Sequence, residues 1–271
     1  MINTIGIDNA LDWQRIRHLF KIGIFAALLV LIGDMLLGWG AANESLTGVE
    51  GYFSRYLTVS DVRIFWSAML GLVGIPLECL SYFGVYRLIA AKSVAYAHAY
   101  RAGIFGMLIF GAPVHVICCA AVYHFKALYA IAPADAAEGA VRFALYFLVP
   151  EAAVMAVFFF LLAIVQIRAF LQGATPLPKL CAVLSVLMGF AVVAAARLFG
   201  NHPAAYAVST GWISFGSLWM LGGLLAASYR QGGEINLVLG SCGWRLRYFC
   251  QRHQPENPQG TSPHYCGACR A

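Results

Sequence analysis

Long apolar stretches that contain almost no charge constrain this chain more than any other feature. A helix needs roughly 20 apolar residues to cross the hydrocarbon core of a bilayer. Stretches of this kind cover residues 22–40, 64–86, 102–125, 143–167, 180–200 and 206–228. Hydrophobic residues make up 61% of the chain and charged residues 11%, whereas soluble domains carry about 25% charged residues. Soluble enzymes and disordered proteins are therefore excluded, and the sequence predicts an all-α fold, a polytopic transmembrane helical bundle of six spans.

The basic residues alternate between the two predicted sides of the membrane. The N-terminus, the 87–101 and 168–179 loops and the tail hold 13 Lys and Arg residues, and the opposite side holds 5. Loops rich in Lys and Arg face the cytoplasm, so both termini are predicted to be cytoplasmic in a bacterial inner membrane. This placement also explains the net charge of +6. No basic run carries interleaved aromatic residues, so no nucleic-acid partner is expected.

The predicted spans divide the chain into parts. Three basic residues before the first stretch resemble the start of a signal peptide. The stretch is longer than a signal-peptide core and contains Asp34, so it is interpreted as an uncleaved first helix. The expected parts are a cytoplasmic interfacial segment 1–21, a transmembrane domain 22–229 and a cytoplasmic tail 230–271.

Ionisable residues inside the predicted spans are the main candidates for function, because charge is costly in lipid. They are Asp34, Glu78, His115, Glu151 and Arg197. At a rise of 1.5 Å per residue, Asp34, Glu151 and His115 lie about 9, 12 and 15 Å from the outer end of their helices, and Glu78 roughly 21 Å. Four of the five residues thus fall in the outer half of the membrane.

Prolines strengthen the case for a site, since Pro76, Pro113 and Pro150 stand just before Glu78, His115 and Glu151. Proline removes a helical hydrogen bond and frees a carbonyl one turn earlier. We expect an outward-opening polar pocket that binds, transports or senses a small molecule or a lipid headgroup. In this interpretation Arg197 is a counter-charge and Glu78 a deeper proton site, with Asn201 and His202 at the mouth of the pocket. The alternative is that the prolines only bend the helices and that the acids pair with Arg197 for structural reasons.

Two other function classes remain open. Asp34, His115 and Glu151 form a set that zinc accepts, and a metal-activated water would make the protein a membrane-embedded hydrolase or lipid-modifying enzyme. The third class is a structural or assembly subunit whose intramembrane charges pair with a membrane-protein partner or with a second copy of the chain.

The C-terminal tail has a composition of its own, with Pro, Gln and Gly between charged residues. Residues 235–250 combine apolar and basic side chains, as interfacial segments on anionic lipid do. Cys250, His253, Cys266 and Cys269 have the spacing of a small zinc knuckle. Few apolar residues surround them, so a disordered tail is the alternative.

The first span carries a recognisable pattern. The stretch 33–39, Gly-Asp-Met-Leu-Leu-Gly-Trp, resembles the first helix of an uncharacterised bacterial family of six-span membrane proteins. The similarity continues through Pro76, Gly84 and the region around His115, and covers residues 20–125. The resemblance implies the six-span fold without naming an activity, and the tail is additional to the pattern.

Overall fold

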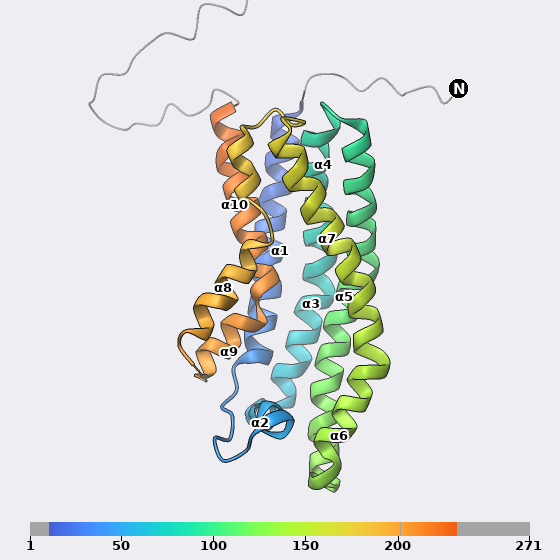
Figure 1. The fold of residues 1–271 in the computed structure, drawn as a ribbon, viewed down its shortest axis with the longest axis vertical. Coiled ribbons are helices and arrows are strands. Elements are labelled where there is room, and N and C mark those ends of the chain that lie inside the picture. The colour runs from blue at the N-terminus through green and yellow to red at the C-terminus, as the bar shows by residue number, and fades with distance from the viewer. Residues whose placement is uncertain (1–10, 201, 232–271) are drawn as a thin grey trace, which may run out of the picture. The chain divides into compact units, whose positions relative to one another are not determined.

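The computed structural model describes residues 11–200 and 202–231, and every regular element within them is a helix. The longer helices are α1 (Trp13–Gly38), α2 (Gly48–Ser54), α3 (Asp61–Ser81), α4 (Phe83–Ala90), α5 (Val94–Ile131), α6 (Pro133–Phe143), α7 (Val149–Leu171), α8 (Met188–Arg197), α9 (Pro203–Thr210) and α10 (Trp212–Gln231). The short elements are η1 (Arg55–Thr58), the π-helical turn η2 (Ala144–Leu148) and η3 (Lys179–Val183). Figure 1 shows the long helices running side by side, with α4 near one end and α2 and α6 near the other.

In the part of the chain that the structure describes, 4 helical runs are long and apolar enough to cross a membrane, or 5 if the bent pair α9–α10 is counted as one span. Within the described residues, the 4 unbent candidates are Trp13–Gly38, Asp61–Ala90, Val94–Ile131 and Pro133–Leu171. Nearly the whole of each of the first four predicted stretches lies inside one of these helical runs. The prediction of an all-α protein with several apolar spans is therefore confirmed.

The first helix begins earlier than the sequence predicted. The carboxylate of Asp12 accepts a hydrogen bond of 2.9 Å from the backbone N–H of Arg15, which is how an N-cap residue satisfies a free donor of the first turn. The helix therefore includes residues 13–21, which the sequence had assigned to a separate interfacial segment.

The fifth apolar stretch, 180–200, does not form one long helix. It divides into η3 and α8, separated by unwound backbone at 184–187. Two carbonyls at this break are satisfied by side chains: Gln166 Nε2 donates to Leu184 O at 2.7 Å, and Trp219 Nε1 donates to Val183 O at 3.0 Å. Non-helical backbone is tolerated at membrane depth where protein supplies such partners, and here α7 and α10 supply them.

The sixth stretch is also interrupted, because α9 and α10 meet at an angle of 59° on either side of Gly211. A Cβ atom at Gly211 would lie 2.5 Å from Leu31 Cδ1, the end of a leucine side chain, so α1 packs closely against this glycine. The bend brings both α9 and α10 against α1.

Glycines also bring α8 and α10 into direct backbone contact. A Cβ at Gly189 would lie 1.9 Å from the carbonyl oxygen of Trp212, and a Cβ at Gly216 would lie 2.0 Å from that of Val186. Small residues at helix interfaces permit this close approach in lipid.

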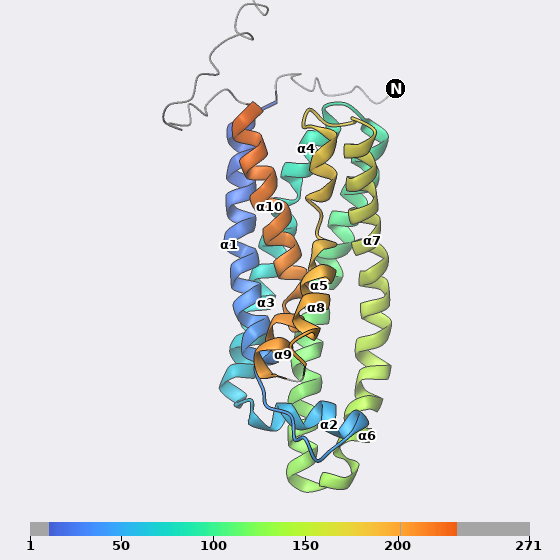
Figure 2. The ribbon, with the colours of Figure 1, turned by 60° about the vertical axis from the view of Figure 1, so that its left-hand side comes forward.

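The main hydrophobic core takes most of its buried residues from α1, α4, α5, α7 and α10. Figure 2 shows these helices from a second side. Its largest fully buried side chains include Phe20, Tyr100 and Phe170. Other large apolar side chains, among them Phe25 and Val157, are more than half-exposed. An apolar outer surface over a packed interior is what a lipid-facing bundle requires.

Candidate functional site

Asp34 and His115 meet in the interior of the bundle. The Nδ1 atom of His115, on α5, lies 3.5 Å from Oδ1 of Asp34, on α1. Ser214, in the first turn of α10, donates a hydrogen bond of 2.9 Å to the other carboxylate oxygen, Oδ2. The Asp34 and His115 side chains each retain 11% exposure. Three helices therefore converge on one largely buried carboxyl group.

The imidazole ring of His115 packs directly against the backbone of α3. A Cβ atom at Gly71 would lie 2.1 Å from Cδ2 of His115, so the ring fits only because residue 71 is glycine. The ring atom Nε2 lies 3.0 Å from the carbonyl oxygen of Ser67. If Nε2–H donates to that oxygen, the Nδ1–Asp34 contact needs a second proton, on either the imidazole or the carboxyl. The pair can thus hold an exchangeable proton.

Asp34 also lies beside the break between α9 and α10. A Cβ at Gly211 would be 3.7 Å from Oδ2 of Asp34, and α10 begins at Trp212, the next residue. The N-terminal end of a helix carries a partial positive charge that favours a nearby carboxylate. The helix break therefore contributes to holding the acid in place.

Cysteines flank the same region on α5. Cys119 Sγ donates a weak hydrogen bond of 3.5 Å to Ser67 Oγ, and Cys118 is half-buried. Cys118 follows His115 by three positions, so both lie on one face of α5.

Glu78 forms a second polar group, deeper in the bundle. Its Oε1 atom accepts hydrogen bonds of 2.5 Å from both Tyr82 OH and Ser217 Oγ, and these two hydroxyl oxygens are 3.0 Å apart. Ser217 stands three residues after Ser214 on α10, and residues three apart are neighbours on a helix surface. One face of α10 thus contacts both buried acids, Asp34 and Glu78.

The remaining predicted site residues lie elsewhere or make other contacts. Glu151 is half-buried in the first turn of α7. Among the described residues it forms no hydrogen bond or ion pair through its side chain. Arg197 is exposed at the end of α8, with its guanidinium 5.8 Å from the ring of Tyr206. His202 caps α9, where its Nδ1 accepts from Ala204 N at 3.2 Å. Asn201 lies outside the described residues.

The structure brings two of the three predicted metal ligands together. Asp34 and His115 are adjacent, but within residues 11–200 and 202–231 no group of three His, Cys, Asp or Glu side chains could hold a metal ion. The predicted zinc knuckle of the tail, Cys250, His253, Cys266 and Cys269, lies outside the described residues.

Sequence reasoning missed a cluster around Arg55, which it had counted only as a basic residue of the outer side. The guanidinium is buried and lies 4.0, 4.8 and 4.5 Å from the ring centres of Tyr52, Tyr56 and Tyr206. It donates a hydrogen bond of 2.8 Å to Tyr56 OH. Burial raises the pKa of Tyr56 above its ordinary value. The available signal was the spacing of tyrosines at 52 and 56, which places them near Arg55 in a helical turn.

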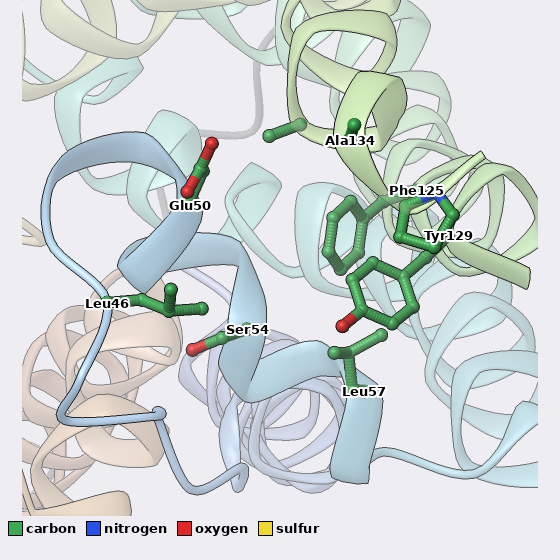
Figure 3. Close-up of a pocket in the computed structure, with 9 residues that line it drawn as sticks. Leu46, Glu50, Ser54, Leu57, Phe125, Tyr129 and Ala134 are labelled. Carbon is green, nitrogen blue, oxygen red and sulfur yellow. The ribbon is translucent and has the colours of Figure 1, made fainter.

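Two cavities lie near opposite ends of the helices. One, of about 260 Å³, lies between α2, α5 and α6, with Phe125, Tyr129 and Leu57 on its wall and Glu50 as its charged residue. Figure 3 shows these side chains around the opening. The other is larger and lies beside the first turns of α1 and beside α4. Neither cavity is lined by Asp34, His115 or Glu78.

The long apolar helices indicate the class of a helical membrane protein, and its interior holds a buried acid–histidine pair. Within that class, the chain belongs to the family of unknown function DUF6796, whose model matches residues 1–231. The prediction of an uncharacterised family is thereby confirmed, and the match ends before most of the tail. No curated protein matches the chain, and no solved structure matches it either.

Proposed function

We propose that this is a multi-pass protein of the bacterial inner membrane that binds a small polar molecule or a lipid headgroup at Asp34, His115 and Ser214. Binding serves either transport of that molecule or sensing of it. The observation that carries the proposal is the convergence of α1, α5 and α10 on one buried carboxyl group. Ionisable residues inside a membrane are expensive and mark binding or proton pathways.

The chemistry of the cluster favours a ligand with a cationic or hydrogen-bond-donating group. The carboxyl of Asp34 has Ser214 as a donor and His115 as its ion-pair partner within the described residues. An ammonium group would complete this arrangement because a buried carboxylate is stabilised by opposite charge. The bend at Gly211 supports such a site, since helices broken at membrane depth form the binding sites of many transporters.

Glu78 acts in this proposal as a proton site coupled to the binding site. Ser217 donates to Glu78 and Ser214 donates to Asp34, so a rotation or shift of α10 changes both contacts together. Protonation of one acid can in this way influence binding at the other.

The proposed topology has six crossings, with both termini in the cytoplasm and the Asp34 site open to the outer side. The fifth crossing consists of η3 and α8, and the sixth of α9 and α10. The distribution of 13 basic residues on the predicted cytoplasmic side against 5 on the other supports this orientation.

The accessibility of Cys118 tests both the orientation and the site. A cationic, membrane-impermeant methanethiosulfonate reagent, applied to cells with a permeabilised outer membrane, should label Cys118 because this half-buried residue shares a face with His115. Cys79, Cys119 and Cys181 are buried and serve as internal controls, and Cys118→Ser should abolish the labelling. Labelling only in inside-out vesicles, or only with membrane-permeant reagents, contradicts an outward-opening site.

A thermal-stability screen tests binding itself. The purified protein is heated with a panel of ethanolamine, choline, amino acids and polyamines, and at least one should raise the unfolding temperature of the wild type. Asp34→Asn should remove this shift, whereas Asp61→Asn, which changes an acid paired with Lys126 near the start of α3, should retain it. A shift of equal size in Asp34→Asn places binding elsewhere.

A further inference from the structure

The larger cavity is not used by the proposed function and has a composition of its own. It measures about 1040 Å³ and lies between the first turns of α1, the end of α3 and α4. Its apolar wall includes Leu19, Ile22, Leu77, Leu80 and Phe83. Ile22 and Leu80 are each 46% exposed, so this cavity is a groove open along its side, where the lipid chains of the surrounding membrane can enter.

Charged residues gather at one end of the groove. Arg15 from α1, Arg87 from α4 and Lys92 from the turn after α4 all line it. Asp12 also lines the groove, where its carboxylate caps α1 through the N–H of Arg15. Within the part of the chain that the structure describes, no ion pair involves the side chain of any of the three basic residues.

We propose that this groove binds an anionic phospholipid of the cytoplasmic leaflet. The phosphate contacts Arg15, Arg87 and Lys92, and an acyl chain lies along the apolar wall. The positive-inside distribution puts these three cations on the cytoplasmic side, and basic pockets between helices on that side bind anionic headgroups. The groove offers positive charge next to apolar surface, which matches the two parts of a phospholipid.

The composition of the wall distinguishes a lipid from a soluble phosphate. A soluble anion would use the basic end alone and would leave Leu77, Leu80 and Phe83 without a partner. A phospholipid covers both parts. The groove shares no lining residue with the Asp34–His115–Ser214 cluster, so binding at one site can fail without the other. The assignment to the cytoplasmic leaflet rests on the topology of the proposed function.

Native mass spectrometry of the full-length protein in non-ionic detergent tests the proposal. Dissociation constants are measured for dioleoyl phosphatidylglycerol, with dioleoyl phosphatidylethanolamine as the reference lipid without net charge. The test variant combines Arg15→Gln, Arg87→Gln and Lys92→Gln. Each basic side chain near an anionic lipid contributes on the order of fivefold in affinity, so the triple variant should bind phosphatidylglycerol on the order of a hundredfold more weakly.

A matched control removes the same number of positive charges, at other residues on the same predicted side of the membrane. Lys21→Gln, Arg101→Gln and Lys179→Gln together remove three basic side chains that do not line the groove. The dissociation constant of this variant for phosphatidylglycerol should stay within about fivefold of the wild-type value, because fivefold is the contribution of one basic residue. Equal loss in both triple variants, or loss in neither, overturns the assignment of the groove.

Two further measurements separate the other possible occupants. Inorganic phosphate and glycerol 3-phosphate at millimolar concentration should not displace the lipid, and displacement by either one overturns the lipid assignment. Deletion of residues 1–10 should leave the affinity unchanged. If phosphatidylglycerol binds only after this deletion, the N-terminal segment occupies the groove and the proposal is wrong.

A variant with intact charges covers the case in which the triple variant does not fold. Ala91 is exposed and lines the groove, so Ala91→Trp fills part of it from the surface. This variant should weaken phosphatidylglycerol binding by about tenfold or more, which corresponds to 1.4 kcal/mol, because the indole ring takes space that the lipid would occupy. Unchanged binding in Ala91→Trp contradicts the proposal.

Discussion

The substitution Gly71→Ala gives a quantitative test of how the imidazole is held. The new Cβ would lie 2.1 Å from Cδ2, 2.4 Å from Nε2 and 2.6 Å from Cγ of His115. Carbon atoms in contact need about 3.5 Å or more, so the ring must move by about 1.4 Å. The hydrogen-bond distance of 3.0 Å between Nε2 and Ser67 O cannot absorb such a movement.

The expected cost follows from opposing terms. Overpacking costs about 1–3 kcal/mol, and the lost hydrogen bond about 0.5–1.5 kcal/mol. Alanine favours the helix over glycine by about 1 kcal/mol. The net destabilisation should therefore be about 0.5–3.5 kcal/mol. It is measured by unfolding the protein in mixed micelles with increasing sodium dodecyl sulfate, followed by tryptophan fluorescence.

A control variant and a double-mutant cycle isolate the clash. A Cβ at Gly222, in α10, would meet no atom within 4 Å, so Gly222→Ala should be neutral or stabilising by up to about 1 kcal/mol. In a His115→Ala background the ring is absent, and Gly71→Ala should then cost almost nothing. Equal destabilisation by Gly71→Ala in both backgrounds refutes the reasoning, because coupling is the signature of direct contact.

Three further predictions concern other parts of the fold. Gln166→Leu leaves the carbonyl of Leu184 without its donor, which should destabilise the protein by about 1–3 kcal/mol and speed amide exchange at 184–187; unchanged exchange contradicts this role. Arg55→Lys loses the planar group that stacks on the tyrosine rings and should cost about 1–2 kcal/mol in the same unfolding assay. Burial raises the pKa of Tyr56 in the folded state, so stability is full below the unfolded value of about 10 and falls as the pH rises above it. Tyr56→Phe should flatten that alkaline decline, and an unaltered slope argues against the effect.

Sequence reasoning predicted the long apolar helices, because apolar length is a property of one segment at a time. The depth estimate put Asp34 and His115 at a similar level, and the two side chains are 3.5 Å apart. The same estimate grouped Glu151 with them, although depth carries no information on which way a helix faces. Glu151 lies on α7, and its contacts depend on the rotation of that helix about its axis.

Around position 184 the fifth stretch is apolar except for Ser185, whose hydroxyl accepts a hydrogen bond of 3.3 Å from Leu187 N. A single serine does not predict that the helix is interrupted. The side chains that satisfy the unwound backbone, Gln166 and Trp219, come from helices on either side of it in the chain. A break of this kind is stable only through tertiary partners. The Arg55 cluster was missed for a related reason, since Tyr206 joins it from a distant part of the sequence.

The backbone contacts at Gly189 and Gly216 have a mechanical consequence. Each glycine faces a carbonyl of the other segment, so neither α8 nor α10 can slide along the other without a steric clash. We therefore expect the two helices to move together. A displacement of Ser214 would then carry α8 with it, and Arg197 at the far end of α8 would change position in the same movement. An event at the buried carboxyl of Asp34 would thus be reported at the surface of the protein.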